Sequence, residues 1–210
     1  MLTWERSCWE NGCDRVAGVD EAGRGPLAGP VVAAAVAMPR ALAESLITTT
    51  LSGLTDSKKL TEKKREAFFT DLTSSSAILW GVGLCEPEEI DRINILRATH
   101  LAMKRAVEGL AMMPDFLLVD GLPVPGLPVK ARAIIKGDAS SFLIAAASVI
   151  AKVTRDRIML DLDRRYPGYG LAKHKGYGTR AHLEALRILG PSACHRKSFA
   201  PVRQLDLPIA

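Results

Sequence analysis

The sequence predicts a single domain of the α/β class, in which helices flank a mixed sheet and the C-terminal part is helical. Short apolar runs alternate with longer stretches of helical periodicity, an order typical of such folds. A length of 210 residues, of which 48% are apolar, suits one domain with a sizeable core. We therefore expect a lead-in at 1–15, the folded domain at 16–202 and a short tail at 203–210.

Five apolar runs are expected to form the strands of this sheet. They lie at 16–19, 31–38, 77–84, 116–119 and 133–136. Each has the length of a short buried strand, and Pro39 ends the second because proline cannot donate to the ladder of hydrogen bonds.

Helical periodicity separates these runs. Thr61 is a suitable N-cap for one helix, Pro87 fits the first turn of the next, and Thr179 caps a short final helix. A long helix is expected from about 140 to 165, and 40–55 is expected to mix a helical turn with loop. The expected buried faces are formed by Phe68, Phe69 and Leu72 in the first helix, by Leu96, Met103, Val107 and Leu110 in the second, and by Leu183, Leu186 and Leu189 in the last.

Composition excludes several classes of protein. The longest apolar run, at 31–38, is far too short to cross a bilayer, and the N-terminus shows no secretion signal. The four cysteines lack the paired spacing of a zinc site and are too few for a disulfide framework, so we expect reduced thiols and a cytoplasmic protein. The net charge of +5 is compatible with a nucleic-acid partner. Lysines and arginines gather at 58–65, 152–165, 173–180 and 195–197.

The stretch 16–30 carries the strongest functional signal. Its strand ends in Asp20 and Glu21 and runs into a turn around Arg24. The glycines of this stretch that we group with the turn are Gly18, Gly23 and Gly25. Such a turn presents carboxylates, bare backbone N–H groups and a guanidinium to a phosphate, although a solvated strand end with an ordinary turn would look the same. Neighbouring strand side chains point to opposite faces, so both acids can face one ligand only if the chain bends, and Gly23 can supply that bend.

Two further acids occupy similar positions. Asp120 follows the fourth predicted strand and Asp138 follows the fifth. The carboxyl ends of strands gather at one edge of an α/β sheet, where these carboxylates would repel one another unless a cation neutralised them. Oxygen ligands without histidine or cysteine favour magnesium or manganese, and a pair of such ions can promote phosphodiester hydrolysis.

Each of these polar residues also has a purely structural interpretation. Asp120 and Gly121 form a common turn pair, and Asp138 could cap the helix that follows it. His100 and His182 lie in helical stretches, where packing or surface positions are commoner than metal sites. The recurrence of acids at successive strand ends favours the metal site, because the structural interpretation needs a separate reason for each residue.

Taken together, the motifs resemble bacterial ribonuclease HII, of the type 2 ribonuclease H family. They are GVDEAGRGPLAGPV, DSKKL, EIDRINIL, VDG, KGD followed by AAASVIAKVTRD, HKGYGT and HRKSF, and they extend from Val16 to about Val202. The resemblance implies an RNase H-like fold and an endonuclease that hydrolyses the RNA strand of RNA–DNA hybrids. It also implies cutting 5′ of single ribonucleotides embedded in duplex DNA, as in ribonucleotide excision repair. The reaction would use two metal ions, Mn²⁺ or Mg²⁺, and leave 5′-phosphate and 3′-hydroxyl ends.

The same resemblance implies the site residues. The catalytic and metal-binding acids would be Asp20, Glu21, Asp120 and Asp138. The substrate-binding residues would be Gly23, Arg24, Gly25, Ser57, Lys58, Lys152, Arg155 and the ribonucleotide-sensing Tyr177.

Departures from the family pattern are small. Thr55 precedes DSKK where the family favours asparagine, which affects a loop contact and no catalytic role. We see no sliding-clamp motif after Val202, expect no extra N-terminal domain like that of ribonuclease HIII, and expect a monomer. Two alternatives remain. A metal nuclease of the resolvase or integrase type would lack the Gly-Arg-Gly turn, and a non-catalytic nucleic-acid-binding protein on this fold would have lost an acid.

Overall fold

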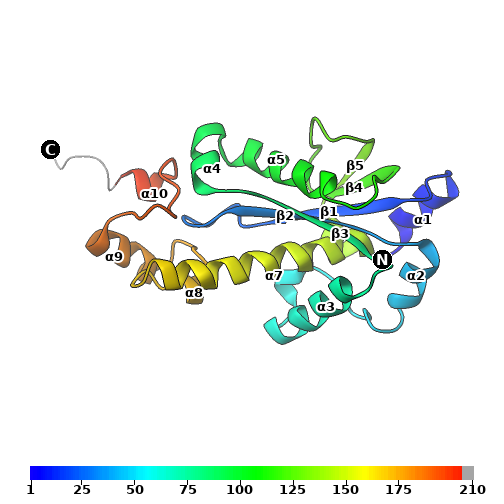
Figure 1. Cartoon of the computed structure of the whole chain (residues 1–210), viewed down its shortest axis with the longest axis horizontal. Helices are drawn as coiled ribbons and strands as arrows, with labels where there is room; N and C mark the ends of the chain where they lie inside the picture. Colours follow the sequence, from blue (N-terminus) through cyan, green and yellow to red (C-terminus); the bar gives the residue numbers. More distant parts are fainter. Residues whose placement is uncertain (205–210) are drawn as a thin grey trace.

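The apolar runs of the sequence form a five-stranded sheet with the order β3-β2-β1-β4-β5 (Figure 1). The computed structural model describes residues 1–204, in which the strands are β1 (Val16–Ala22), β2 (Val31–Ala37), β3 (Leu79–Cys85), β4 (Phe116–Asp120) and β5 (Ala131–Ile134). β2 is antiparallel to both β1 and β3, whereas β1, β4 and β5 run parallel to one another. The mixed sheet is therefore confirmed, and the carboxyl ends of β1, β4 and β5 lie at one edge.

The last strand lies two residues earlier than the predicted 133–136. Lys136 adopts the left-handed conformation, with φ +57°, and precedes the short helix α6 (Gly137–Ser140). This turn ends β5 at Ile134 and brings the chain back over the sheet edge.

Helix α7 (Phe142–Arg165) covers one face of the sheet (Figure 1). Ser141 caps it by accepting a hydrogen bond from the backbone N–H of Ile144. The helix approaches β1 so closely that a Cβ on Gly18 would overlap the backbone of Leu143. Gly18 is therefore a packing residue, and its grouping with the phosphate-binding turn is wrong.

Helices α4 (Pro87–Ile93) and α5 (Ile95–Glu108) cover the opposite face (Figure 1). Asn94, with φ +68°, separates them and caps α5 by accepting from the backbone N–H of Arg97. Met103 and Val107 are buried as predicted, but Leu96 is 49% exposed. The break at Asn94 starts a new helix at Ile95, so the first turn of α5 does not continue the buried face.

The segment 1–15 is part of the folded core, contrary to the predicted lead-in. It forms helix α1 (Thr3–Glu10), in which Glu5 is fully buried. The carboxylate of Glu5 accepts hydrogen bonds from Ser141 Oγ at 2.6 Å and from the backbone N–H of Leu143 at 3.0 Å. An acid at this position suits the positive end of the α7 dipole, so Glu5 fastens the start of the chain to that helix.

Three more elements follow β2 and lead to β3. They are α2 (Arg40–Leu46), the 3₁₀ turn η1 (Ser57–Lys59) and α3 (Glu62–Ser74). Thr61 caps α3 by accepting from the backbone N–H of Lys64, as predicted, and Phe68 and Leu72 are buried.

Helices α8 (Leu171–His174), α9 (Arg180–Leu189) and α10 (Ala200–Arg203) gather near the C-terminal end of α7 (Figure 1). Thr179 caps α9 and Leu186 is buried, both as predicted, but Leu189 is 51% exposed because Gly190 ends the helix directly after it. Residues 205–210, most of the predicted tail and of the segment searched for a clamp motif, lie outside the described residues. No helix in the described part of the chain is long and apolar enough to span a membrane.

Candidate active site

The predicted acids lie together at the carboxyl edge of the sheet. Asp20 and Glu21 are near the end of β1, Asp120 ends β4, and Asp138 lies in the first turn of α6 after β5. The backbone orients two of them: Glu21 N–H donates to Asp20 Oδ1 at 2.7 Å, and Gly137 N–H donates to Asp120 Oδ1 at 2.7 Å. Parallel pairing of β1 with β4 and of β4 with β5 thus gathers acids that are as far apart in the sequence as Asp20 and Asp138.

The acids repel one another. Burial, followed by the charges of Glu21 and Asp120, raises the pKa of Asp20 well above its ordinary value. Burial and then Asp120 raise the pKa of Asp138, and burial raises the pKa of Glu21 although Arg24 opposes it. Burial alone would lower the pKa of Lys58, but the surrounding acids outweigh it and raise that pKa. The edge therefore carries more negative charge than its own lysine and arginine neutralise.

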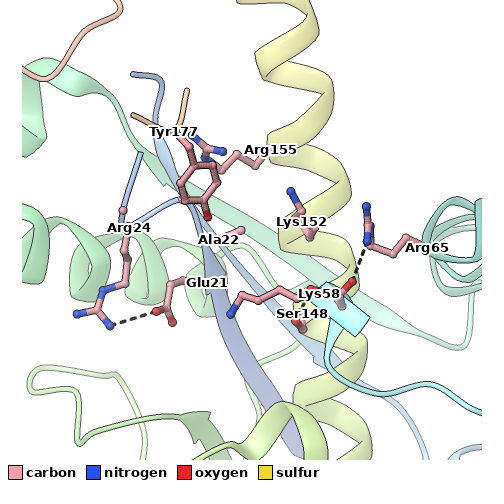
Figure 2. A pocket seen from close by; sticks show the side chains of 12 residues that line it. Glu21, Ala22, Arg24, Lys58, Arg65, Ser148, Lys152, Arg155 and Tyr177 are labelled. Atoms are coloured by element: carbon pink, nitrogen blue, oxygen red, sulfur yellow. Dashed lines mark hydrogen bonds and ion pairs between the residues drawn. The ribbon is translucent and has the colours of Figure 1, made fainter. Parts of the chain in front are cut away.

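A cavity of about 490 Å³ opens beside these acids (Figure 2). Its lining is mostly polar and basic and consists of Glu21, Ala22, Gly23, Arg24, Gly25, Ser57, Lys58, Arg65, Ser148, Lys152, Arg155 and Tyr177. Glu21 and Arg24 also line a hollow of about 110 Å³ with His100 and Asp120, and Lys58 lines one of about 380 Å³ with Asp120 and Asp138. The three hollows share lining residues, so they lie next to one another around the acidic edge.

Two buried arginines lie behind the Gly-Arg-Gly turn: Arg196 binds its carbonyls, and Arg155 packs against Gly23. Gly23 has φ +94°, a conformation that favours glycine. Arg196, fully buried, donates to the carbonyls of Gly23, Arg24 and Gly29 at 2.6, 3.0 and 2.9 Å. This leaves the Arg24 side chain 52% exposed at the cavity, paired with Glu21 at 3.3 Å.

Arg155 is the second of these arginines. It is 1% exposed and donates to the carbonyls of Ala28, Pro30 and Lys175 at 3.0 to 3.1 Å. The resemblance implied a substrate contact, and the structure shows a buried guanidinium whose three nitrogens each donate to a backbone carbonyl at the cavity wall. Arg155 thus joins the segments around Ala28, Pro30 and Lys175.

Sequence reasoning did not single out Arg196. Its signals were the basic cluster at 195–197 and the HRKSF motif, and neither distinguishes an exposed phosphate contact from a buried clamp on carbonyl groups.

Tyr177 stands at the opposite wall of the cavity. Its side chain is 47% exposed, and Figure 2 shows the ring over the cavity with the hydroxyl directed inward. A Cβ on Gly25 would lie 3.6 Å from its Cε1 atom, so the ring flanks the Gly-Arg-Gly turn. The loop is fixed by a bond from Tyr177 N–H to the carbonyl of His174. The structure thus places the predicted tyrosine beside the turn.

The basic residues from η1 and α7 complete the cavity. Lys58 is exposed, whereas Ser57 is buried with its hydroxyl 2.9 Å from that of Ser148. Lys152 pairs with Asp156 at 2.6 Å and still lines the cavity. Arg65, which sequence reasoning missed, donates to the carbonyls of Ser57 and Leu60 and holds η1 in place.

Residues 17–202 match the family model described as ribonuclease HII. Curated relatives named ribonuclease HII include one from Desulfitobacterium hafniense (strain Y51), 56% identical over 99% of this chain and 77% of the relative. Another, from Myxococcus xanthus (strain DK1622), is 53% identical over 99% of this chain and 69% of the relative.

The crystal structure of ribonuclease H2 from Pyrococcus horikoshii OT3 is 31% identical, with a TM-score of 0.75 over 91% of this chain and 97% of that one. Its likeness confirms the RNase H-like fold. With the family model matching almost the whole chain and relatives above half identity, the chain belongs to the ribonuclease HII family and is a hydrolase of the ribonuclease H type.

Proposed function

We propose that this chain is an endonuclease that hydrolyses the RNA strand of RNA–DNA hybrids and also cuts 5′ of single ribonucleotides embedded in duplex DNA. Divalent cations, Mg²⁺ or Mn²⁺, would be held by the four acids at the carboxyl edge. The observation that carries the proposal is the junction of this edge with a basic cavity that has Tyr177 on its opposite wall. A cytoplasmic role in ribonucleotide excision repair follows naturally from such an activity.

The chemistry of the acids fits a hard cation. Asp20, Glu21 and Asp138 all have raised pKa values, with burial as the largest cause, and an added cation would lower them. Within residues 1–204 no three His, Cys, Asp or Glu side chains already converge on one point as a metal site. The strand ends bring the donors into one region, and the set is chemically suited to Mg²⁺ or Mn²⁺. A structural neighbour, a ribonuclease HIII, has been solved in complex with Mn²⁺.

When bound there, divalent cations would promote attack by water on the phosphodiester and stabilise the leaving 3′ oxygen. The protein itself positions the duplex. Lys58 and Arg24 are exposed at the cavity and provide positive charge for phosphates on either side of the scissile bond. Arg196 binds the carbonyls of Gly23 and Arg24, so the backbone N–H groups of the Gly-Arg-Gly turn can serve as further donors to phosphate.

Recognition of a single ribonucleotide requires a group that detects one 2′-hydroxyl. Tyr177 combines a phenol hydroxyl with a flat ring that can stack on a sugar or base, and it lies beside Gly25, which has no side chain to obstruct the approach. The family match and the presence of all four acids favour this function over the resolvase and the non-catalytic alternatives.

The test is a duplex with one ribonucleotide, labelled at the 5′ end of the strand that carries it. Wild-type protein with Mg²⁺ should give one cut on the 5′ side of the ribonucleotide. Tyr177→Phe should weaken cleavage and Tyr177→Ala should nearly abolish it, with the melting temperature little changed because the ring is half exposed. A cut on the 3′ side, or wild-type cleavage by Tyr177→Ala, would contradict the proposal.

A further inference from the structure

Two buried histidines connect the walls of the cavity. His182, in α9, is fully buried, and His195 is 1% exposed. His182 Nδ1 lies 2.9 Å from the carbonyl oxygen of Tyr177, and His182 Nε2 lies 3.0 Å from His195 Nε2. Sequence reasoning assigned His182 to packing, but both of its ring nitrogens have polar partners.

The direction of each hydrogen bond in this series, from Ser192 through the two imidazoles to Tyr177, is fixed. Ser192 N–H donates to His195 Nδ1 at 3.0 Å, so that nitrogen is an acceptor and the proton of neutral His195 resides on Nε2. His195 Nε2–H must then donate to His182 Nε2, which leaves the proton of neutral His182 on Nδ1. His182 Nδ1–H therefore donates to the carbonyl of Tyr177.

The His195 end of this series of hydrogen bonds is connected to the Gly-Arg-Gly turn. His195 pairs with Ala28 through a β-bridge, and Arg196 N–H donates to the carbonyl of Leu27. The Arg196 guanidinium then binds the carbonyls of Gly23 and Arg24. A continuous set of polar contacts thus runs from the turn, through both imidazoles, to the backbone of Tyr177.

We propose that His182 and His195 are positioning residues that set the place of Tyr177 relative to the Gly23–Gly25 turn through this one-way relay of hydrogen bonds. The inference rests on the proposed role of Tyr177 in detecting a ribonucleotide. Neither imidazole contacts the substrate cavity, so both act through Tyr177.

The relay requires His182 to be neutral, because a proton added to it would set two N–H groups against each other at Nε2. A proton added to His195 Nδ1 would displace the bond from Ser192 N–H and would meet Ser192 Oγ, 2.9 Å away, while Nε2–H could still donate to His182. The titratable groups facing the pair are His174, stacked on His182 at 4.4 Å, Tyr169, whose ring is 4.7 Å from His195, and Cys194. Burial lowers the pKa of His182, lowers that of His195 to about 4, and raises those of Tyr169 and Cys194. His182 and His195 are therefore uncharged at neutral pH.

The first test needs no variant. NMR of the imidazole ¹⁵N nuclei in the full-length protein at pH 7.5 should show His195 protonated on Nε2 and His182 protonated on Nδ1. His195 should stay neutral down to about pH 5, since burial lowers its pKa to about 4, and His182 should titrate below the ordinary 6.5 because burial lowers its pKa. The opposite tautomer of either ring, or a charged His182 at pH 7.5, would overturn the relay.

The second test uses the ratio of two cleavage rates, on a duplex with one ribonucleotide and on an RNA–DNA hybrid. A hybrid offers a 2′-hydroxyl at every position of one strand, so it tolerates a misplaced Tyr177 better. His182→Ala should lower the ratio about tenfold, the effect of about 1.4 kcal/mol expected for one lost hydrogen bond. His182→Asn, whose amide can donate from nearly the position of Nδ1, should restore most of it. Glu184→Gln, an exposed change on the same helix, should leave the ratio unchanged.

A double mutant separates this inference from the proposed function. In the Tyr177→Ala background, His182→Ala should have no further effect on the ratio, because the residue it positions is gone. If Tyr177→Ala lowers the ratio and His182→Ala does not, the positioning role is refuted while the function stands. If Tyr177→Ala itself leaves the ratio unchanged, the proposed sensing role fails, and the tautomers still decide whether the relay exists.

Discussion

Replacement of Gly23 by alanine should disturb the Gly-Arg-Gly turn and the packing of Arg155 against it. Gly23 has φ +94°, which an L-residue adopts only with strain, and a Cβ at this position would overlap Nε and Cδ of Arg155. Arg155 is buried and cannot move without giving up bonds to the carbonyls of Ala28, Pro30 and Lys175. The substitution therefore disturbs both the turn and the loop that precedes Tyr177.

The expected loss of stability follows from these contacts. The backbone strain of alanine at positive φ costs about 1–2 kcal/mol. One or two displaced hydrogen bonds of Arg155 add about 1 kcal/mol each. The sum is about 3 kcal/mol, which for a chain of this length lowers the melting temperature by about 6–12 °C.

Thermal unfolding followed by circular dichroism at pH 7.5 measures this loss. Gly25→Ala is the matched control, because its Cβ would meet only Tyr177 Cε1 at 3.6 Å, an ordinary contact. The control should melt within about 2 °C of wild type, well inside the effect predicted for Gly23→Ala. If Gly23→Ala also melts that close to wild type, the clamp by Arg155 is not what supports the turn.

Three further outcomes follow from the structure. Gly18→Ala should lower stability by about 3 kcal/mol or prevent folding, since the methyl group overlaps the backbone of Leu143; denaturant unfolding against Gly25→Ala, whose Cβ makes only an ordinary contact, checks this. Arg24→Ala should reduce the slope of log affinity against log salt by about one for a duplex bound by an inactive variant. Burial lowers the pKa of His195 from 6.5 to about 4, so below pH 6.5 the unfolded chain binds a proton that the folded chain does not. Stability should therefore fall as the pH drops from 6.5 towards 4, by up to about 3 kcal/mol relative to His195→Gln.

Each of these has a clear contrary result. Equal unfolding of Gly18→Ala and Gly25→Ala would mean that α7 does not pack closely on β1 at this point. An unchanged salt slope for Arg24→Ala would remove Arg24 from the phosphate contacts. Parallel pH profiles for wild type and His195→Gln would show that His195 is not held neutral by burial.

The sequence predicted the acidic edge because strand ends can be read locally. Asp20, Glu21 and Asp120 each lie at the end of a short apolar run. Parallel pairing of β1 with β4 then places these ends at the same edge of the sheet. The place of Tyr177 at the cavity was also predicted, because its loop motif resembles that of a known family.

The supporting residues could not be predicted in the same way. Arg155 and Arg196 look like surface cations in a basic stretch, yet their partners are carbonyl groups brought near only by the folded chain. Glu5 was placed in a lead-in because its partner, Ser141, is 136 residues away. The predicted burial of Leu96 was wrong for a local reason, because the positive φ of Asn94 was not expected. Sequence periodicity does not show contacts between distant segments, and it does not show where the backbone becomes irregular.

The central claim is that the acids of the carboxyl edge form a cation-dependent nuclease site. Its most direct test compares Asp120→Asn with wild type on the single-ribonucleotide duplex at saturating Mg²⁺. Asp115→Asn is the matched control, since Asp115 precedes the same strand at its other end and pairs with Arg15 at 2.7 Å. Asp120→Asn should fold, with stability equal to or slightly above wild type because it relieves repulsion on Asp20, and should show no cleavage, whereas Asp115→Asn should cleave normally. Wild-type cleavage by a folded Asp120→Asn protein would contradict the account.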